Sequence, residues 1–287
     1  MGATERPIGL FDSGVGGLTV LRAIRARLPG ESLLYVGDSA RVPWGPKGPA
    51  LVTSYATQIA DTLVEAGCKA IVIACNTASA AAVDVVRARA SVPVIDVIRP
   101  MAAAVHANAA WRRIAVLATQ TTVTSRAYPR AFHDLGPGYI VEQNAAPLFV
   151  PLAEEGWTEG LVPLEAARKY LAPVLRYGPV DALVLGCTHY PLLTQVVREA
   201  MTKELGQAPP ILESGEVVAE SLAMELEREG LLAPDDRPGA VRYRVTDAPE
   251  RFAALGERFL GEPLRDVELL PLRVLESKGI FSAKATH

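Results

Sequence analysis

The chain has 287 residues, of which 49% are hydrophobic and 21% are charged. This length suits one large or two medium-sized domains with an ample core, and the hydrophobic share excludes a disordered chain. With 29 Lys and Arg against 32 Asp and Glu, the formal net charge is −3, so no overall basic field predicts nucleic-acid binding.

The chain also lacks the usual signals for export or membrane insertion. No segment approaches the roughly 20 consecutive apolar residues of a membrane span, and the apolar run near the start is too short for a signal-peptide core. The three cysteines, Cys68, Cys75 and Cys187, are too few for a disulfide framework. We therefore expect a cytoplasmic protein with no membrane partner.

Short apolar runs alternate with amphipathic segments along the chain. The runs are continuous rather than alternating, which is typical of strands buried on both faces of a parallel sheet. Predicted strands are 8–11, 33–36, 70–74, 92–97, 114–118, 139–141, 182–186 and 210–212. Predicted helices are 18–28, 49–66, 78–90, 123–135, 163–176, 191–205 and 217–229. This alternation predicts an α/β fold with mainly parallel sheets flanked by helices.

The second half of the chain repeats the pattern of the first. The strand AIVIAC, ending at Cys75, matches ALVLGC, ending at Cys187, and IGLFDSGVGG (8–17) aligns with IAVLATQTTV (114–123). The repetition predicts an internal duplication: two similar domains related by a pseudo-twofold, with the active site between them. We expect one domain from residues 1–98 plus 213–287, and a second from 99–212.

The segment after Gly230 has no counterpart in the other half. It predicts a loop over 231–240, two further strands at 241–245 and 267–270, and a helix at 248–259. We expect this tail to pack onto one of the two domains.

Polar residues follow the predicted strands at six places. In parallel α/β sheets, ligands bind beyond the carboxyl ends of the strands, where helix N-termini present free amides. The six clusters therefore predict a pocket for a small, polar, zwitterionic ligand. They are Asp12-Ser13-Gly14, Gly37-Asp38 with Pro43-Trp44-Gly45, Cys75-Asn76-Thr77, Thr119 with Thr121-Thr122, Cys187-Thr188-His189 and Glu213-Ser214-Gly215.

The two strand-end cysteines are the sharpest chemical signal. A thiol at a helix N-terminus is expected to have a lowered pKa, because the free amides and the helix dipole stabilise the thiolate. Cysteine is also a common small core residue, and that interpretation suits Cys68. Two thiols at duplicated positions, each followed by polar residues, instead favour a pair of acid/base groups on either side of a planar reacting centre.

Other site types find little support in the sequence. DSGVGG resembles half of a dinucleotide fingerprint, but Thr19 occupies the place of its last small residue. There is no P-loop, and the four histidines form no ligand-spaced cluster with cysteines or carboxylates. We expect neither a cofactor nor a metal.

Taken together, the motifs resemble those of the glutamate racemases, within the cofactor-independent Asp/Glu racemase family. The matching stretches extend from residue 8 to about 221. They are IGLFDSGVGGLTV, YVGDSARVPWG, IVIACNTAS, PLFVPLAEEG and LVLGCTHYPLL.

This resemblance implies a role for each matching residue. Cys75 would be the base for D-glutamate and Cys187 the base for L-glutamate, each returning the proton from its own face. Asp12, His189 and Glu154 would be auxiliary catalytic groups. Substrate-binding residues would be Asp12, Ser13, Pro43, Trp44, Gly45, Asn76, Thr77, Thr119, Thr122, Thr188 and His189. Two departures are Trp44, where the family usually has Tyr, and the stretch 118–122, which lacks the family's glycines.

The resemblance further implies glutamate as substrate, a homodimer, and a supply of D-glutamate for peptidoglycan synthesis. Three alternatives stay open from the residues. An aspartate racemase would need a smaller pocket. A binding or regulatory module would have kept the pocket and lost turnover. A redox sensor would need Cys75 and Cys187 to meet.

Overall fold

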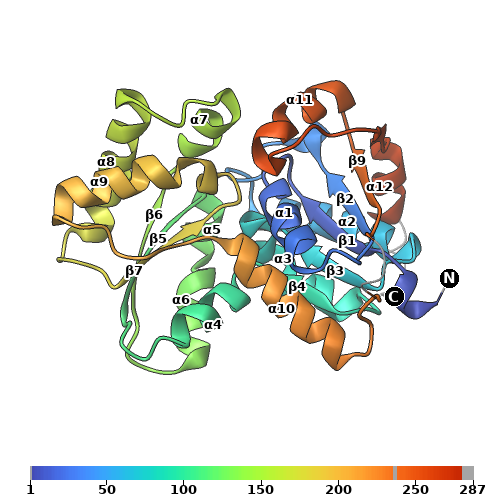
Figure 1. Ribbon diagram of the computed structural model, residues 1–287, viewed down its shortest axis with the longest axis horizontal. Coiled ribbons are helices and arrows are strands. Elements are labelled where there is room, and N and C mark those ends of the chain that lie inside the picture. Colours follow the sequence, from blue (N-terminus) through green and yellow to red (C-terminus); the bar gives the residue numbers. More distant parts are fainter. Residues whose placement is uncertain (1, 235–237, 280–287) are drawn as a thin grey trace.

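The computed structural model describes residues 2–234 and 238–279, and it contains two parallel β-sheets (Figure 1). The first sheet has the order β10-β9-β2-β1-β3-β4, and the second has the order β6-β5-β7-β8. All the strand pairings are parallel in the described part of the chain. The strands are β1 (Ile8–Asp12), β2 (Leu33–Gly37), β3 (Ala70–Ile73), β4 (Val94–Asp96), β5 (Arg113–Ala118), β6 (Ile140–Ala145), β7 (Ala182–Gly186), β8 (Ile211–Leu212), β9 (Val241–Val245) and β10 (Val267–Leu269).

Helices cover both faces of these sheets, which explains the continuous apolar runs. On β1, Leu10 belongs to a cluster shared with α1 and α10, whereas Phe11 belongs to a cluster shared with α2 and α3. The α/β class predicted from the alternation is confirmed. The helices are α1 (Leu18–Arg27), α2 (Pro49–Glu65), α3 (Asn76–Arg89), α4 (Arg99–His106), α5 (Gln120–Ser125), α6 (Ala127–Leu135), α7 (Phe149–Glu155), α8 (Leu161–Leu175), α9 (Thr194–Leu205), α10 (Ser214–Arg228), α11 (Pro249–Leu260) and α12 (Leu272–Gly279).

Four strands of each sheet share one topology. β1, β2, β3 and β4 have the order 2-1-3-4, and β5, β6, β7 and β8 repeat that order. The chain direction across each sheet therefore reverses next to the first strand, between β1 and β3 and between β5 and β7. A ligand crevice is expected outside the carboxyl ends at these two points, where the chain places Asp12 and Cys75 in one sheet and Thr119 and Cys187 in the other.

Several elements differ from the sequence prediction. The helix expected over 123–135 is two helices, because Arg126 has a left-handed backbone (φ 55°) that ends α5 and begins α6. β6 is longer than expected, and α4, α7 and α12 were not predicted. The strands of each sheet come from the segments expected for that domain. The domain limits at 98/99 and 212/213 stay a prediction.

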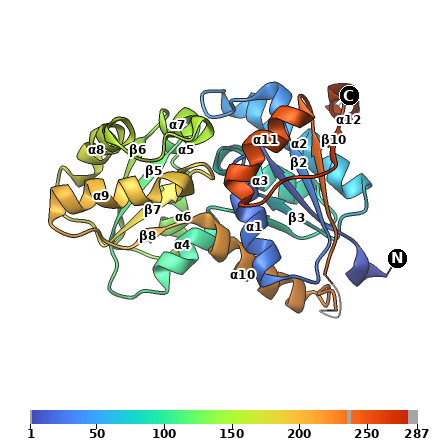
Figure 2. The same ribbon diagram turned by 45° about the horizontal axis from the view of Figure 1, so that its top comes forward.

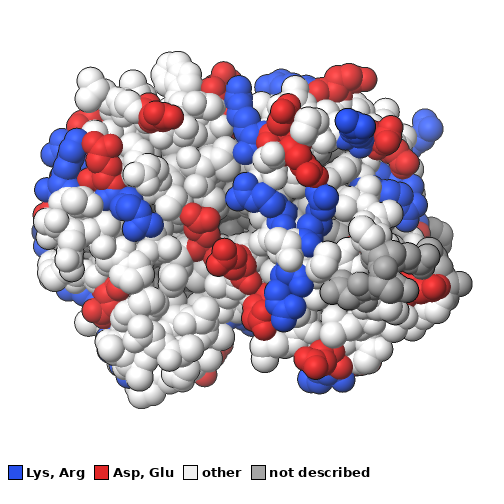
Figure 3. All heavy atoms as spheres, in the orientation of Figure 1, with Lys and Arg blue, Asp and Glu red and all other residues white. Residues whose placement is uncertain are grey.

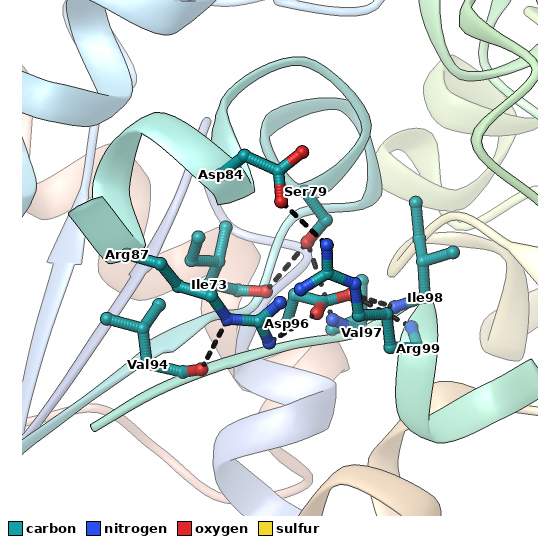
Figure 4. Close-up of polar contacts among 9 residues, drawn as sticks. All are labelled: Ile73, Ser79, Asp84, Arg87, Val94, Asp96, Val97, Ile98 and Arg99. Carbon is teal, nitrogen blue, oxygen red and sulfur yellow. Dashed lines mark hydrogen bonds and ion pairs between the residues drawn. The ribbon is translucent and has the colours of Figure 1, made fainter. Parts of the chain in front are cut away.

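A polar cluster holds the chain where it leaves the first sheet (Figure 4). Asp96, at the end of β4, accepts hydrogen bonds through Oδ1 from the backbone N–H groups of Ile98 and Arg99, at 2.7 and 2.9 Å. Its Oδ2 accepts from Arg87 at 2.9 Å. Burial raises the pKa of Asp96 despite these donors. The carboxylate thus caps α4 and orients the crossing to the second sheet.

The tail returns to the first sheet, with β9 pairing along β2. Lys69 anchors its beginning: the buried ammonium lies 2.5 Å from Glu31 and donates to the carbonyl of Leu231 at 2.8 Å. Of the loop predicted over 231–240, residues 235–237 lie outside the described part, as do 280–287 of the predicted first domain. None of the helices in the described ranges has the length and apolar character to span a bilayer.

The turn that follows β1 lies in close contact with the turn that follows β7. A Cβ atom at Gly16 would lie 2.3 Å from Nδ1 of His189 and 2.5 Å from Oγ1 of Thr188. Beside this contact, the hydroxyl of Thr19 lies 2.9 Å from the Gly16 carbonyl and 3.1 Å from the Thr188 carbonyl, as donor to both. The absence of a side chain at Gly16 therefore lets the turn after β1 touch the turn after β7.

We predict that Gly16→Ala destabilises the protein by about 1–3 kcal/mol, because the added methyl group must push the two turns apart. The measurement is urea unfolding followed by circular dichroism. Gly48→Ala is the matched control, since a Cβ added there would have no neighbour within 4 Å. Gly48 is the N-cap of α2, so this variant should lose only the smaller free energy of a poorer cap. Equal stability of the two variants would contradict the close contact.

Candidate active site

The carboxyl edges of the two sheets enclose a cavity of about 430 Å³. Both Cys75 and Cys187 line it, so the structure brings the two thiols predicted from the duplication to one space. The other predicted site residues on its wall are Asp12, Ser13, Pro43, Trp44, Gly45, Asn76, Thr77, Thr119, Glu154, Thr188 and His189.

Cys75 sits at the N-cap of α3, almost fully buried. Its sulfur accepts a hydrogen bond from the Ala78 N–H at 3.5 Å, and its thiol lies 3.7 Å from the Ser13 hydroxyl. The lowered pKa expected from the helix position is wrong for this residue. Burial raises the pKa of Cys75 well above its ordinary value, and the adjacent Asp12 charge adds to the effect, so the amide hydrogen bonds are outweighed.

Asp12 ends β1 beside this thiol and is itself buried. Its Oδ2 accepts from the Gly17 N–H at 2.7 Å, and its Oδ1 accepts from the Ser13 hydroxyl at 3.4 Å. Gly17 is required here, because a Cβ would lie 2.7 Å from Cβ of Asp12. The turn after β1 thus fixes a carboxylate next to Cys75.

His189 and Glu154 form a pair on the other side of the cavity. Nε2 of His189 lies 3.1 Å from Oε1 of Glu154, which comes from the last turn of α7. Burial alone would lower the pKa of His189, but hydrogen bonding to Cys187 and Glu154, with the charge of Asp12, raises it to about 10. The same hydrogen bond lowers the pKa of Glu154. The cationic imidazole is therefore favoured when the Cys187 thiol is ionised, because the charge of Cys187 is one of the causes that raise the His189 pKa.

A row of threonine hydroxyls joins the two halves. Oγ1 of Thr77 lies 2.8 Å from Oγ1 of Thr119, which lies 3.0 Å from Oγ1 of Thr122. Thr122, predicted to contact substrate, is fully buried and absent from the cavity wall. It lies behind Thr119 and holds that hydroxyl in place.

The loop that carries Pro43, Trp44 and Gly45 is held by the second half. The hydroxyl of Thr121 donates to the carbonyls of Gly45 and Lys47, both at 2.8 Å. The ring of Trp44 packs against Tyr55, with centroids 5.6 Å apart, and forms a buried aromatic wall.

Sequence reasoning missed several residues of this site. The amide of Asn76 donates to the hydroxyl of Tyr128 at 3.0 Å. A Cβ on Gly186, the residue before Cys187, would lie 3.0 Å from the Tyr128 ring. Tyr128 lies within a predicted helix, where nothing marked it as polar or strand-terminal. The apolar wall contains Val42, Pro147, Val150 and Pro151. The last three belong to the PLFVPLAEEG stretch (147–156), which was the available signal.

One predicted cluster and part of another lie elsewhere. Asp38 is buried under the tail, where its carboxylate accepts from Thr246 and Arg41. Glu213 and Gly215 line a separate hollow of about 940 Å³ between α1 and α10. Their strands are not at the points where strand order reverses, so their ends open away from the shared crevice. Cys68, expected to be a packing residue, is 2% exposed, and burial raises its pKa to about 11.

The described residues of the cavity wall include neither Lys nor Arg. Hydroxyls and backbone amides at the starts of α3 and α5 are the donors available to an anionic group. No group of three His, Cys, Asp or Glu in residues 2–234 and 238–279 is placed to hold a metal ion. The arrangement combines two thiols, a carboxylate beside one and a cation beside the other, which are the elements of proton transfer at two faces of a ligand.

Comparison with known proteins agrees with this geometry. Residues 18–235 match the family model described as Asp/Glu/Hydantoin racemase. The chain is 45% identical to a glutamate racemase of Neisseria meningitidis serogroup C, over 93% of this chain and 97% of that one.

Solved structures show the same likeness. A glutamate racemase of Francisella tularensis, in complex with D-glutamate, superposes with a TM-score of 0.86 at 35% identity, covering 96% of this chain and 99% of the other. One from Thermus thermophilus, in complex with β-chloro-D-alanine, has a TM-score of 0.83 at 43% identity, covering 94% and 99%. The resemblance seen in the motifs is confirmed, and the chain belongs to the Asp/Glu/hydantoin racemase family, alongside its glutamate racemases.

Proposed function

We propose that this protein is a glutamate racemase that interconverts L- and D-glutamate by proton transfer between two thiols, without a cofactor. The observation that carries the proposal is the presence of Cys75 and Cys187 on the wall of one cavity, each at the end of an equivalent strand. The likeness to glutamate racemases over nearly the whole chain supports glutamate as the substrate.

The reaction needs the two thiols in opposite protonation states. In the L-to-D direction, the Cys187 thiolate removes the α-proton: the Cα–H bond breaks, an S–H bond forms, and the electron pair stays on the substrate. The Cys75 thiol then delivers its proton to the opposite face. The thiols exchange roles for the reverse reaction, and no oxidant or reductant is required.

The electrostatic surroundings support this pairing. The His189 cation lies beside Cys187, whereas the Asp12 carboxylate lies beside the buried Cys75. A bound α-ammonium group next to Asp12 would offset the negative charge that opposes ionisation of Cys75. The amides and hydroxyls of Asn76, Thr77 and Thr188 would hold the α-carboxylate and stabilise the carbanion as its charge develops.

Three further features belong to the same proposal. D-Glutamate would supply peptidoglycan synthesis in a bacterial cytoplasm, as the resemblance implies.

The active form would be a homodimer, which is the commonest symmetric assembly. Exposed apolar side chains on and around α7 and α8, among them Trp157 and Leu161, are candidates for its interface. Sedimentation of the purified protein measures the assembly.

The first prediction concerns exchange at Cα. Incubated with L-glutamate in D2O without added cofactor, the protein should form D-glutamate carrying deuterium at Cα, followed by NMR and chiral chromatography. L-Aspartate is the parallel substrate. An absence of exchange with glutamate, or exchange with aspartate alone, would overturn the proposed substrate; disulfide formation without exchange would favour the redox alternative.

A second prediction separates the two thiols. Because the enantiomers have equal free energy in water, Cys75→Ser and Cys187→Ser should each lower kcat/KM equally in both directions, by about 10²–10⁴-fold. The α-deuterium isotope effect distinguishes them. In Cys75→Ser it should rise for D-glutamate and fall towards unity for L-glutamate, and Cys187→Ser should show the reverse.

Cys68→Ser is the matched control, because Cys68 lies in the core away from the cavity wall. Isotope effects that stay symmetric in both active-site variants would show that the two thiols do not act on separate faces.

A further inference from the structure

The tail that follows Gly230 lies largely beyond the family match, which ends at residue 235. Its helix α11 does more than cover the first sheet. Figures 1 and 2 show α11 at the junction of the two halves, next to α7, which carries Glu154. On the face shown in Figure 3, positive and negative side chains are interspersed along this junction rather than segregated.

The first contact of α11 with the site is made by Phe259. This side chain is fully buried, and its ring meets the His189 imidazole edge-on, with centroids 5.0 Å apart and planes at 75°. Such an edge-to-face pair restricts the orientation of both rings. The imidazole is thus confined by Phe259 in addition to its hydrogen bond to Glu154.

The second contact is made by Arg258. Its guanidinium donates to the backbone carbonyl of Glu154, in the last turn of α7. Carbonyls in the last turn have no partner within their own helix and carry partial negative charge, so a cation is favoured there. Gly156, which ends α7 with φ 76°, leaves the space: a Cβ there would lie 3.2 Å from Cζ of Arg258.

We propose that α11 holds the His189 imidazole and the Glu154 carboxylate in their relative positions. Phe259 and Arg258, which belong to a helix packed on the first sheet, are the positioning residues. The catalytic consequence rests on the proposed function, whereas the positioning itself does not. A segment outside the duplicated units would thereby complete the Cys187 side of the site.

The charged groups around the imidazole determine what a loosened contact would do. Cys187, Glu154 and Asp12 face His189 from β7, α7 and β1, and Arg251 of α11 acts on Glu154. Burial lowers the pKa of His189, so its raised value depends on the contacts with Cys187 and Glu154 staying close. Loosening these contacts while an apolar side chain still keeps water out should therefore lower the pH at which His189 loses its proton, because the effect of burial remains while the hydrogen bonds weaken.

The direct test is the NMR titration of the histidine side chains in the whole protein, which has four histidines. The His189 signal is identified by its loss in His189→Gln. In Phe259→Leu its midpoint should fall by about one pH unit, a tenfold change in proton affinity. Arg258→Met should shift it in the same direction by less, since Arg258 is exposed, and Arg258→Lys should restore part of the shift.

Phe252→Leu is the matched control on the same helix. Phe252 is buried against Tyr35, with ring centroids 6.0 Å apart, and makes no ring contact with His189. A midpoint unchanged in both Phe259→Leu and Arg258→Met, or moved as far by Phe252→Leu, would overturn the proposal.

Racemisation gives the second readout. Phe259→Leu should lower kcat by about 10- to 100-fold, as expected for a misplaced catalytic group, with a smaller change in KM. The alkaline limb of its kcat/KM profile should move to lower pH. If the wild-type protein does not racemise glutamate but the NMR shifts occur, the proposed function fails and the positioning by α11 stands.

Discussion

The site depends on a contact between two turns that leaves no room for a Cβ atom at Gly16. The turn after β1 can touch the turn after β7 only because Gly16 has no side chain, with His189 Nδ1 and Thr188 Oγ1 occupying the space where a Cβ would be. Other cross-links then reinforce the contact: the Thr19 hydroxyl, the Thr77–Thr119 pair and the Asn76–Tyr128 hydrogen bond. All of them join the carboxyl edges of the two sheets. The two ligand crevices, one per sheet, thereby open into one shared cavity.

Duplication makes the two thiols equivalent in topology, and the surrounding residues make them different in charge. Asp12 and Glu154 are not related by the repeat, and neither is His189, whose counterpart after Cys75 is Thr77. Both thiols are buried, but a carboxylate neighbours one and an imidazole the other. A symmetric backbone with asymmetric side chains suits a reaction whose two half-steps need one acid and one base. The tail adds to the asymmetry, because Phe259 and Arg258 of α11 contact the His189–Glu154 pair.

Local pattern was sufficient to predict the strands, the parallel sheets and the placement of Cys75 and Cys187 in one site, because continuous apolar runs and strand-end polar residues are encoded within a few positions. Features that depend on burial or on distant segments were not accessible. The pKa of Cys75 is raised because the folded chain surrounds it, which outweighs its helix position. Asp38 and Glu213 end strands like the others, yet strand order directs them away from the cavity. The contact of Phe259 with His189 joins residues 70 positions apart (259 − 189) that share no motif.

A cavity wall without Lys or Arg limits how an acidic amino acid can be recognised. A lysine stem can bend to follow a displaced carboxylate, whereas amides and hydroxyls fixed by helix starts and mutual hydrogen bonds cannot. For the proposed substrate, the distance between its two carboxylates would therefore have to match donors that hold fixed positions. Shortening the ligand by one methylene would leave one carboxylate short of its donors. The discrimination of glutamate from aspartate would then reside in the spacing of these donors.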